Sequence, residues 1–120
     1  MPAKTIAVIV SDLMFQSRLR EQVTALDYEI AVADTPDAVD EALAAGPALV
    51  ILDLHIAGID WRQAVAMAKE RDAPVLAFGR HTEAELLRSA REAGCDRVVP
   101  RSTLVQELPE LVKELAGERA

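Results

Sequence analysis

The chain is 120 residues long, which fits one domain, and it carries 20 acidic against 13 basic residues for a formal net charge of −7. This acidic balance opposes direct binding to nucleic acid or to an anionic membrane surface. Cys95 is the only cysteine, so an internal disulfide and a cysteine-based zinc site are excluded, and we expect it to be a small core residue. We expect a single domain over residues 1–120 in the cytoplasm, because the sequence shows neither a membrane-spanning apolar run nor a signal peptide.

Short apolar runs alternate with segments of helical spacing along the chain. The first run, Thr5–Val10, is rich in β-branched residues and too short for a free helix, so it predicts a buried strand. A helix is expected next, because large apolar residues recur at helical spacing: Phe15, Leu19, Val23 and Leu26. A second strand is expected over residues 28–33, followed by a helix that begins with the cap and proline of Thr35-Pro36-Asp37.

The remaining chain repeats the same alternation three times. The further strands are expected at residues 48–52, 74–78 and 96–99, and the further helices at about 60–70, 82–93 and 102–116. The strand over 48–52 is the most apolar, so it should lie at the centre of the sheet. Thr82 is expected to cap the fourth helix, and Gly94 to end it in a left-handed conformation.

Five strand-helix repeats require parallel strands, because each right-handed crossover returns the chain in the same direction. We therefore expect an α/β fold with a doubly wound five-stranded parallel sheet, which binds ligands beyond the carboxyl ends of its strands. Asp12 follows the first strand and Asp53 follows the third, so adjacent strands would bring two carboxylates together. Two such acids repel each other unless a cation neutralises them, which predicts a weak Mg²⁺ site. The alternative is that each acid only caps the next helix.

The residues around Asp53 resemble the receiver domain of bacterial response regulators. The segment that carries the resemblance is Val50-Ile51-Leu52-Asp53-Leu54-His55-Ile56-Ala57-Gly58-Ile59-Asp60. The resemblance covers nearly the whole chain and implies a flavodoxin-like, CheY-like (βα)5 fold with strand order 2-1-3-4-5. It also implies that Asp53 accepts phosphate from a histidine kinase. Asp12, Asp53 and the backbone carbonyl of His55 are the implied Mg²⁺ ligands.

Several positions depart from the receiver pattern. Gly79 stands where receivers carry a Thr or Ser hydroxyl that bonds the phosphate. Arg101 stands at the lysine position, so the positive charge is kept while the shape of the side chain changes. Ser102 follows in place of proline, so the peptide bond between them should be trans. Val98 replaces the switch aromatic of the fifth strand. These departures predict an incomplete switch.

Other loop residues leave alternatives open. Ala57 replaces the proline of the receiver loop, and Trp61 either shields the phosphate pocket, marks a partner surface or, more simply, packs against its neighbours. Arg80 and His81 either bind an anion or are solvated loop residues. The segment Asp53–Gly58 also fits the DxHxxG pattern of cobalamin-binding domains, with SxL at Ser102-Thr103-Leu104. That family places its histidine after the first strand and has a later GG, so we interpret this overlap as accidental.

The leading interpretation is an atypical receiver domain that acts by contact with a histidine kinase or another signalling protein, and not as an enzyme. Asp53 is then either phosphorylated with altered switching or part of a phosphorylation-independent docking module. A flavodoxin-like cofactor-binding domain is the third possibility, which the absence of a glycine-rich phosphate loop disfavours. The resemblance also implies a homodimer through the fourth and fifth helices, with Leu86, Leu87 and Val105 as exposed candidates.

Overall fold

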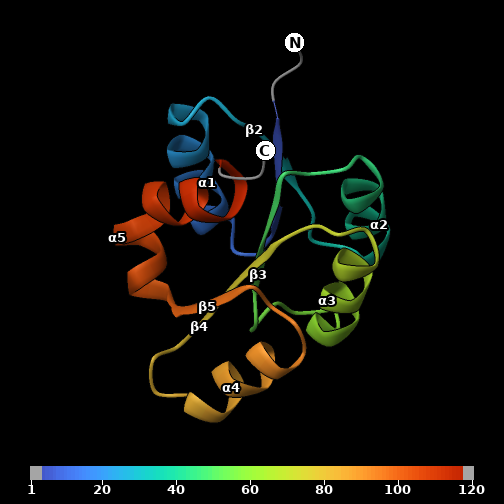
Figure 1. Cartoon of the computed structure of the whole chain (residues 1–120), viewed down its shortest axis with the longest axis vertical. Helices are drawn as coiled ribbons and strands as arrows, with labels where there is room; N and C mark the ends of the chain where they lie inside the picture. Colours follow the sequence, from blue (N-terminus) through green and yellow to red (C-terminus); the bar gives the residue numbers. More distant parts are fainter. Residues whose placement is uncertain (1–3, 118–120) are drawn as a thin grey trace.

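The computed structural model describes residues 4–117 and contains five parallel strands in one sheet. The strands are β1 (Thr5–Ile9), β2 (Glu29–Val32), β3 (Leu49–Asp53), β4 (Val75–Gly79) and β5 (Arg97–Pro100). Their spatial order is β2-β1-β3-β4-β5, with β3 in the centre (Figure 1). This confirms the predicted parallel sheet and the central position of the third strand. The ends of the predicted 1–120 domain, residues 1–3 and 118–120, lie outside the described part.

Helices cover both faces of the sheet. They are α1 (Leu13–Ala25), α2 (Pro36–Ala44), α3 (Trp61–Glu70), α4 (Ala84–Glu92) and α5 (Arg101–Val112), followed by a π-helical segment, Lys113–Gly117. The helices α1 and α5 lie on one face, while α2, α3 and α4 lie on the other (Figure 1). The predicted doubly wound arrangement is therefore confirmed. Within residues 4–117, no helix is both long and apolar enough to span a membrane.

The sheet separates two apolar cores. Successive side chains of a strand point to opposite faces, so Ile6 and Val8 of β1 pack with α1 and α5, while Ala7 and Ile9 pack with the other three helices. Cys95 belongs to the core between the sheet and the helices α2, α3 and α4 (the α2–α4 core). Burial there raises the pKa of its thiol to about 11. The expectation that this cysteine is a core residue is thus confirmed.

The helix ends follow local chemistry, with one exception. Thr35 caps α2, because its Oγ1 accepts a hydrogen bond from Ala38 N at 3.1 Å, and Pro36 occupies the first turn. Gly94 follows α4 with φ +112°, as predicted. The predicted cap of α4 is wrong: the helix begins at Ala84, Glu83 occupies the cap position, and Thr82 is an exposed turn residue. The turn closed by Glu83 N and Arg80 O, 3.0 Å apart, delays the helix start.

The last helix is less regular than the sequence spacing predicts. Glu107 has non-helical angles (φ −116°, ψ 17°), and Pro109 lies inside α5. Proline has no N–H, so it cannot donate to the carbonyl of residue 105, and its ring disturbs the preceding turn. Val105 O accepts instead from Gln22 Nε2 of α1 at 3.1 Å. The predicted regular helix over 102–116 is therefore a kinked α-helix followed by a π-helical segment.

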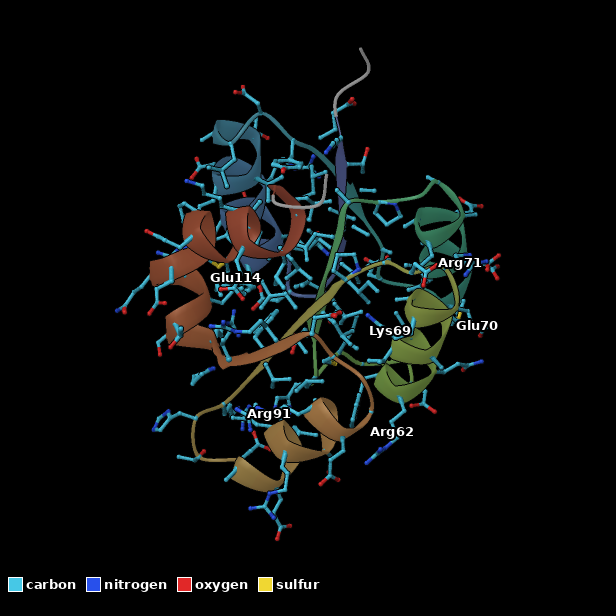
Figure 2. The ribbon with its side chains drawn as sticks, in the orientation of Figure 1. Arg62, Lys69, Glu70, Arg71, Arg91 and Glu114 are labelled. Atoms are coloured by element: carbon cyan, nitrogen blue, oxygen red, sulfur yellow. The ribbon has the colours of Figure 1, made fainter. Side chains whose placement is uncertain are left out.

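Asp96, which precedes β5, connects β4 and α3 at the edge of the sheet where the strands begin. Its Oδ2 accepts from Val75 N of β4 and from Lys69 Nζ of α3, both at 2.7 Å. Arg71 follows α3 directly (Figure 2), and its Nη2 lies 3.3 Å from Asp40 Oδ1 of α2. Because exposed ion pairs contribute little stability, the backbone hydrogen bond to Asp96 is the more important of these contacts.

Candidate functional site

Asp12 follows β1 and Asp53 is the last residue of the neighbouring strand β3, so both acids lie at the carboxyl edge of the sheet, as the alternation predicted, although Asp53 belongs to its strand and does not follow it. Asp12 is the cap of α1: its Oδ1 accepts from Met14 N at 3.0 Å and from Phe15 N at 3.1 Å. The hydrogen bond from Phe15 N is the main cause that holds the Asp12 pKa below its ordinary value, and Arg101 adds to it. The capping alternative for Asp12 is therefore part of its role.

Arg101 is the cation beside Asp12. It is the first residue of α5, and its Nη2 lies 3.4 Å from Asp12 Oδ2. Its guanidinium also stacks 4.0 Å from the centre of the Phe15 ring, an arrangement that a planar guanidinium favours over an ammonium. Phe15 in turn packs against Phe78 of β4, with ring centres 5.3 Å apart. Arg101 thus balances the first acid and is fixed by an aromatic face.

Asp53 is the last residue of β3 and is half-buried. Its backbone pairs with Phe78 of β4, which fixes its height at the sheet edge. Its side-chain Oδ1 accepts from His55 N at 2.8 Å, so the carboxylate is held against the loop that follows the strand. It does not cap α3, because Asp60 takes that role through a 3.0 Å bond from Arg62 N. The capping alternative thus fails for Asp53.

A polar contact joins the loop after β3 to the start of α4. His55 Nε2 lies 2.6 Å from Glu83 Oε1, and Arg80 Nε lies 4.0 Å from the same oxygen. This contact was not predicted, because 28 positions separate the two residues in the sequence and Glu83 belongs to no motif. Arg80 and His81 are both exposed, in keeping with solvated loop residues.

Gly79 ends β4 beside this loop, and the space for a side chain at this position is tight. A Cβ at residue 79 would lie 3.2 Å from Leu87 Cδ2 and 3.6 Å from Leu54 Cδ1. Leu87 is only 6% exposed, so its predicted role on an exposed dimer surface is wrong: the helix turns this leucine toward the sheet. Leu86 and Val105 are half-buried, and Val98 is buried in the α2–α4 core.

The donors available for Mg²⁺ are two carboxylates and a backbone carbonyl. Asp12, Asp53 and the His55 carbonyl are hard oxygen donors of the kind that Mg²⁺ prefers, so the residues fit such an ion. Arg101 already contacts Asp12, so an ion bound there competes with a guanidinium. Within the described residues, no cluster of three or more His, Cys, Asp or Glu side chains forms a metal site.

Two large apolar side chains stand exposed directly after Asp12. Leu13 is 74% exposed and Met14 is 85% exposed, at the first turn of α1. Beside them, a shallow groove of about 420 Å³ runs between α1 and α5. Its lining consists of Phe15, Arg18, Arg101, Ser102, Val105 and Gln106. The sequence analysis does not predict this exposure, because the apolar residues at helical spacing begin at Phe15 and leave out Leu13 and Met14.

Trp61 begins α3, after the loop in which Ala57 and Gly58 are exposed. It is half-buried against the α2–α4 core, and the Arg62 guanidinium lies 4.5 Å from its ring centre. The simpler of its alternatives, packing against neighbours, is the one that these contacts support.

Solved structures of other proteins share this architecture. No protein-family model and no curated protein matches the chain. A putative response regulator from Chloroflexus aurantiacus is 18% identical with a TM-score of 0.83, over 98% of this chain and 100% of that chain. The receiver domain of a sensor histidine kinase from Pseudomonas aeruginosa, solved with magnesium in its active-site cleft, is 13% identical with a TM-score of 0.83. The match covers 98% of this chain and 100% of that chain.

A longer protein shows the same likeness. NtrX from Brucella abortus, solved with ADP, is 19% identical with a TM-score of 0.85, and the match covers 97% of this chain but only 27% of that chain. At these identities the agreement concerns the backbone architecture. The five-stranded sheet with order 2-1-3-4-5 and its five helices therefore have the CheY-like fold of response-regulator receiver domains.

Proposed function

We propose that this chain is an atypical receiver domain of bacterial two-component signalling, with Asp53 as its phosphoacceptor. The observation that supports this most directly is the placement of Asp53 at the end of the central strand, with Oδ1 bonded to His55 N at 2.8 Å. Within the described residues, Oδ2 has no hydrogen-bond partner in the protein. A carboxylate that is anchored through one oxygen and free at the other is suited to nucleophilic attack.

The proposed reaction is a phosphoryl transfer. An Asp53 oxygen attacks the phosphorus of a phosphohistidine or of an acyl phosphate. The new bond joins phosphorus to Asp53, the P–N or P–O bond of the donor breaks, and its electron pair leaves with the imidazole or the acetate. The main task of the protein is to position the groups and to balance the charge of the phosphoryl oxygens.

Arg101 and Mg²⁺ share the charge-balancing role in this proposal. Bound by Asp12, Asp53 and the His55 carbonyl, Mg²⁺ would supply positive charge at the phosphoryl oxygens. Arg101 begins α5 at the same edge and brings a fixed guanidinium, which can hold phosphate through two N–H groups. Because Arg101 rests against Asp12, we expect Mg²⁺ affinity to be weak.

The partners in this proposal are signalling proteins. A protein phosphodonor that reaches Asp53 approaches the edge where Leu13 and Met14 stand exposed, and such side chains are suited to a protein contact. The domain then works by contact and does not turn over a substrate. A homodimer through α4 and α5 stays a prediction, with Leu86 and Val105 as its remaining candidates.

A second form of the proposal is a docking module that is independent of phosphorylation. The specific observation in its favour is that Leu87 fills the space beside Gly79, so the edge holds no hydroxyl at that position to bond a phosphate. Val98 likewise offers no aromatic side chain that could change position. In this form, Asp53 serves only to hold the loop through His55 N.

Intact-mass measurement after incubation with acetyl phosphate and Mg²⁺ separates the two forms. The wild type should gain one phosphoryl group, and Asp53→Ala should gain none. Asp37→Asn is the matched control, because Asp37 is an exposed acid in the first turn of α2. Modification that persists in Asp53→Ala excludes Asp53 as the acceptor, and an unmodified wild type favours the docking module.

A further inference from the structure

Glu83 occupies the cap position of α4 but does not cap the helix with its side chain. Its carbonyl accepts the first helical hydrogen bond, from Leu87 N at 3.1 Å, while its carboxylate makes no capping bond. Oε1 is instead buried from solvent and turned toward His55 Nε2, 2.6 Å away. Arg80 Nε is more distant, at 4.0 Å. A buried carboxylate oxygen without a partner is unfavourable, and Oε1 accepts no hydrogen bond within the described residues, so the 2.6 Å approach of the imidazole is its nearest polar contact.

His55 also holds Asp53. The backbone N–H of His55 donates to Asp53 Oδ1, and the imidazole of the same residue meets Glu83. One residue therefore connects the candidate phosphoacceptor to the first turn of α4. The two contacts are made by different parts of His55, so each is sensitive to a movement of the loop.

An apolar contact runs beside this polar one. Leu54, between Asp53 and His55, donates its N–H to Phe78 O at 3.0 Å, and its side chain faces the same space beside Gly79 as Leu87. Leu54 and Leu87 thus line the same space, while His55 meets the cap residue of α4. No side chain of residue 79 stands between them, because that residue is glycine.

Resting on the proposed function above, we propose that the His55–Glu83 contact transmits the state of Asp53 to α4. A phosphoryl group on Asp53 adds negative charge beside His55 and competes with Glu83 for the imidazole. Loss of the contact leaves the Glu83 carboxylate without its partner and loosens the first turn of α4. In this scheme His55 and Glu83 are positioning residues, and they act where the missing hydroxyl at residue 79 would have acted.

Amide hydrogen exchange of α4, with and without beryllofluoride and Mg²⁺, tests this coupling, while ¹⁹F NMR reports beryllofluoride bound at Asp53. In the wild type, exchange in the first turn of α4 should rise when the ligand binds. In Glu83→Gln it should be fast already and change little further. Because coupling is reciprocal, Glu83→Gln should bind beryllofluoride about fivefold more tightly or better. Glu85→Gln is the matched control, with the same charge change on an exposed residue of the same turn, and should behave as the wild type.

Variants of His55 separate a specific contact from a general structural role. His55→Gln keeps a side-chain donor for Glu83 and should retain part of the response of α4, whereas His55→Phe should abolish it. Melting midpoints of all variants establish that they are folded. If Glu83→Gln keeps the full response of α4 to beryllofluoride, the inference is wrong.

Failure of the proposed function gives a different result. If the wild type shows no bound beryllofluoride, Asp53 is not a working acceptor site. The coupling is then judged from Asp53→Ala, which removes the acceptor of His55 N. That substitution should change exchange in α4 of the wild type but not of Glu83→Gln, and an unchanged α4 in both backgrounds overturns the inference.

Discussion

Leu87 packs tightly against the place where a side chain of residue 79 would begin, with Leu87 Cδ2 3.2 Å from the position of a Cβ at Gly79. Leu87 is 6% exposed and belongs to the α2–α4 core, so any shift that makes room at residue 79 takes place within that packed core. The missing hydroxyl at this edge is therefore tied to the packing of α4. A side chain at residue 79 requires Leu87 to shift by a few tenths of an ångström.

Gly79→Thr should destabilise the protein by about 1–3 kcal/mol, because its methyl and hydroxyl groups overpack the space that Leu87 fills. Urea unfolding measures the loss. The double variant Gly79→Thr/Leu87→Ala should be more stable than the sum of the two single changes indicates, since the deletion makes room for the addition. Simple additivity would show that the two side chains do not compete for one space.

Arg101→Ala should raise the Asp12 pKa toward its ordinary value without fully restoring it, because the hydrogen bond from Phe15 N remains the larger cause of the lowering. A carboxyl ¹³C titration by NMR follows the change, with Arg18→Ala as the control for loss of a nearby charge. An unchanged Asp12 pKa in Arg101→Ala would mean that the 3.4 Å contact is not formed in solution.

The lowered Asp12 pKa also sets a direction for stability against pH. The native form holds this proton less tightly than the unfolded chain, so the contribution is fully present above the unfolded pKa of about 3.9. It is lost as the pH falls through the lower native pKa. The free energy of unfolding, followed by circular dichroism, should therefore fall less between about pH 5 and about pH 2 when Asp12 is replaced by Asn. An equal fall in both proteins would contradict a lowered Asp12 pKa.

Cys95 should react slowly with thiol reagents in the native protein. Burial raises its pKa to about 11, so at pH 8 roughly one thiol in a thousand is ionised, and the thiolate is the reactive form. A chromogenic disulfide reagent should label the protein fast in denaturant and at least an order of magnitude more slowly without it. Equal rates in both conditions would contradict the buried position.

Gln22 and Pro109 form a pair that a double-mutant cycle can test. Gln22→Ala removes the donor that Val105 O has in place of the missing proline N–H, and should destabilise the protein by about 1 kcal/mol. In a Pro109→Ala background the helix supplies that donor itself, so Gln22→Ala should matter less. Urea unfolding of the four proteins gives the coupling, and a value near zero would separate the two features.

Leu13 and Met14 should speed phosphoryl transfer from a protein donor but not from a small molecule. Replacing both with Ser should slow phosphorylation by a kinase at least fivefold, because two exposed apolar contacts are lost, at about 1 kcal/mol or more together. The rate with acetyl phosphate should stay as in the wild type. Ala25→Ser, at the exposed other end of α1, is the comparison for a change on the same helix. Equal effects on both donors would point to a loss of structure.

The strands were predictable because apolar runs recur with regular spacing, yet three of them begin and end one residue later than predicted. The predicted strand over 48–52 is Leu49–Asp53 in the structure, and the predicted 74–78 and 96–99 are Val75–Gly79 and Arg97–Pro100. Hydropathy describes side chains, whereas the ladder is made by the backbone. Asp53 therefore extends β3 by pairing with Phe78, despite its charge.

The helix details depend on contacts across the fold. Leu86 and Leu87 are equally apolar in sequence, and only the rotation of α4 against the sheet decides that Leu87 is buried. The kink of α5 follows from Pro109, whose effect a spacing of apolar residues does not register. The partner of Val105 O comes from 83 positions away, in α1.

The site was predictable as a pair of acids but not as a set of contacts. Parallel strands place the residues that follow them at one edge, and this brings Asp12 and Asp53 there. The contact of Arg101 with Asp12 and that of His55 with Glu83 depend on side-chain conformations and on loop paths. No local pattern encodes them.

The partition of the interior by the sheet also provides a built-in optical assay. Trp61, the only tryptophan, packs against the α2–α4 core. Tyr28, the only tyrosine, packs against the other core, which lies between the sheet and the two helices α1 and α5. Each half of the molecule therefore carries its own intrinsic fluorophore. Emission from the two rings, recorded without any label, reports which half responds when a ligand or a partner binds.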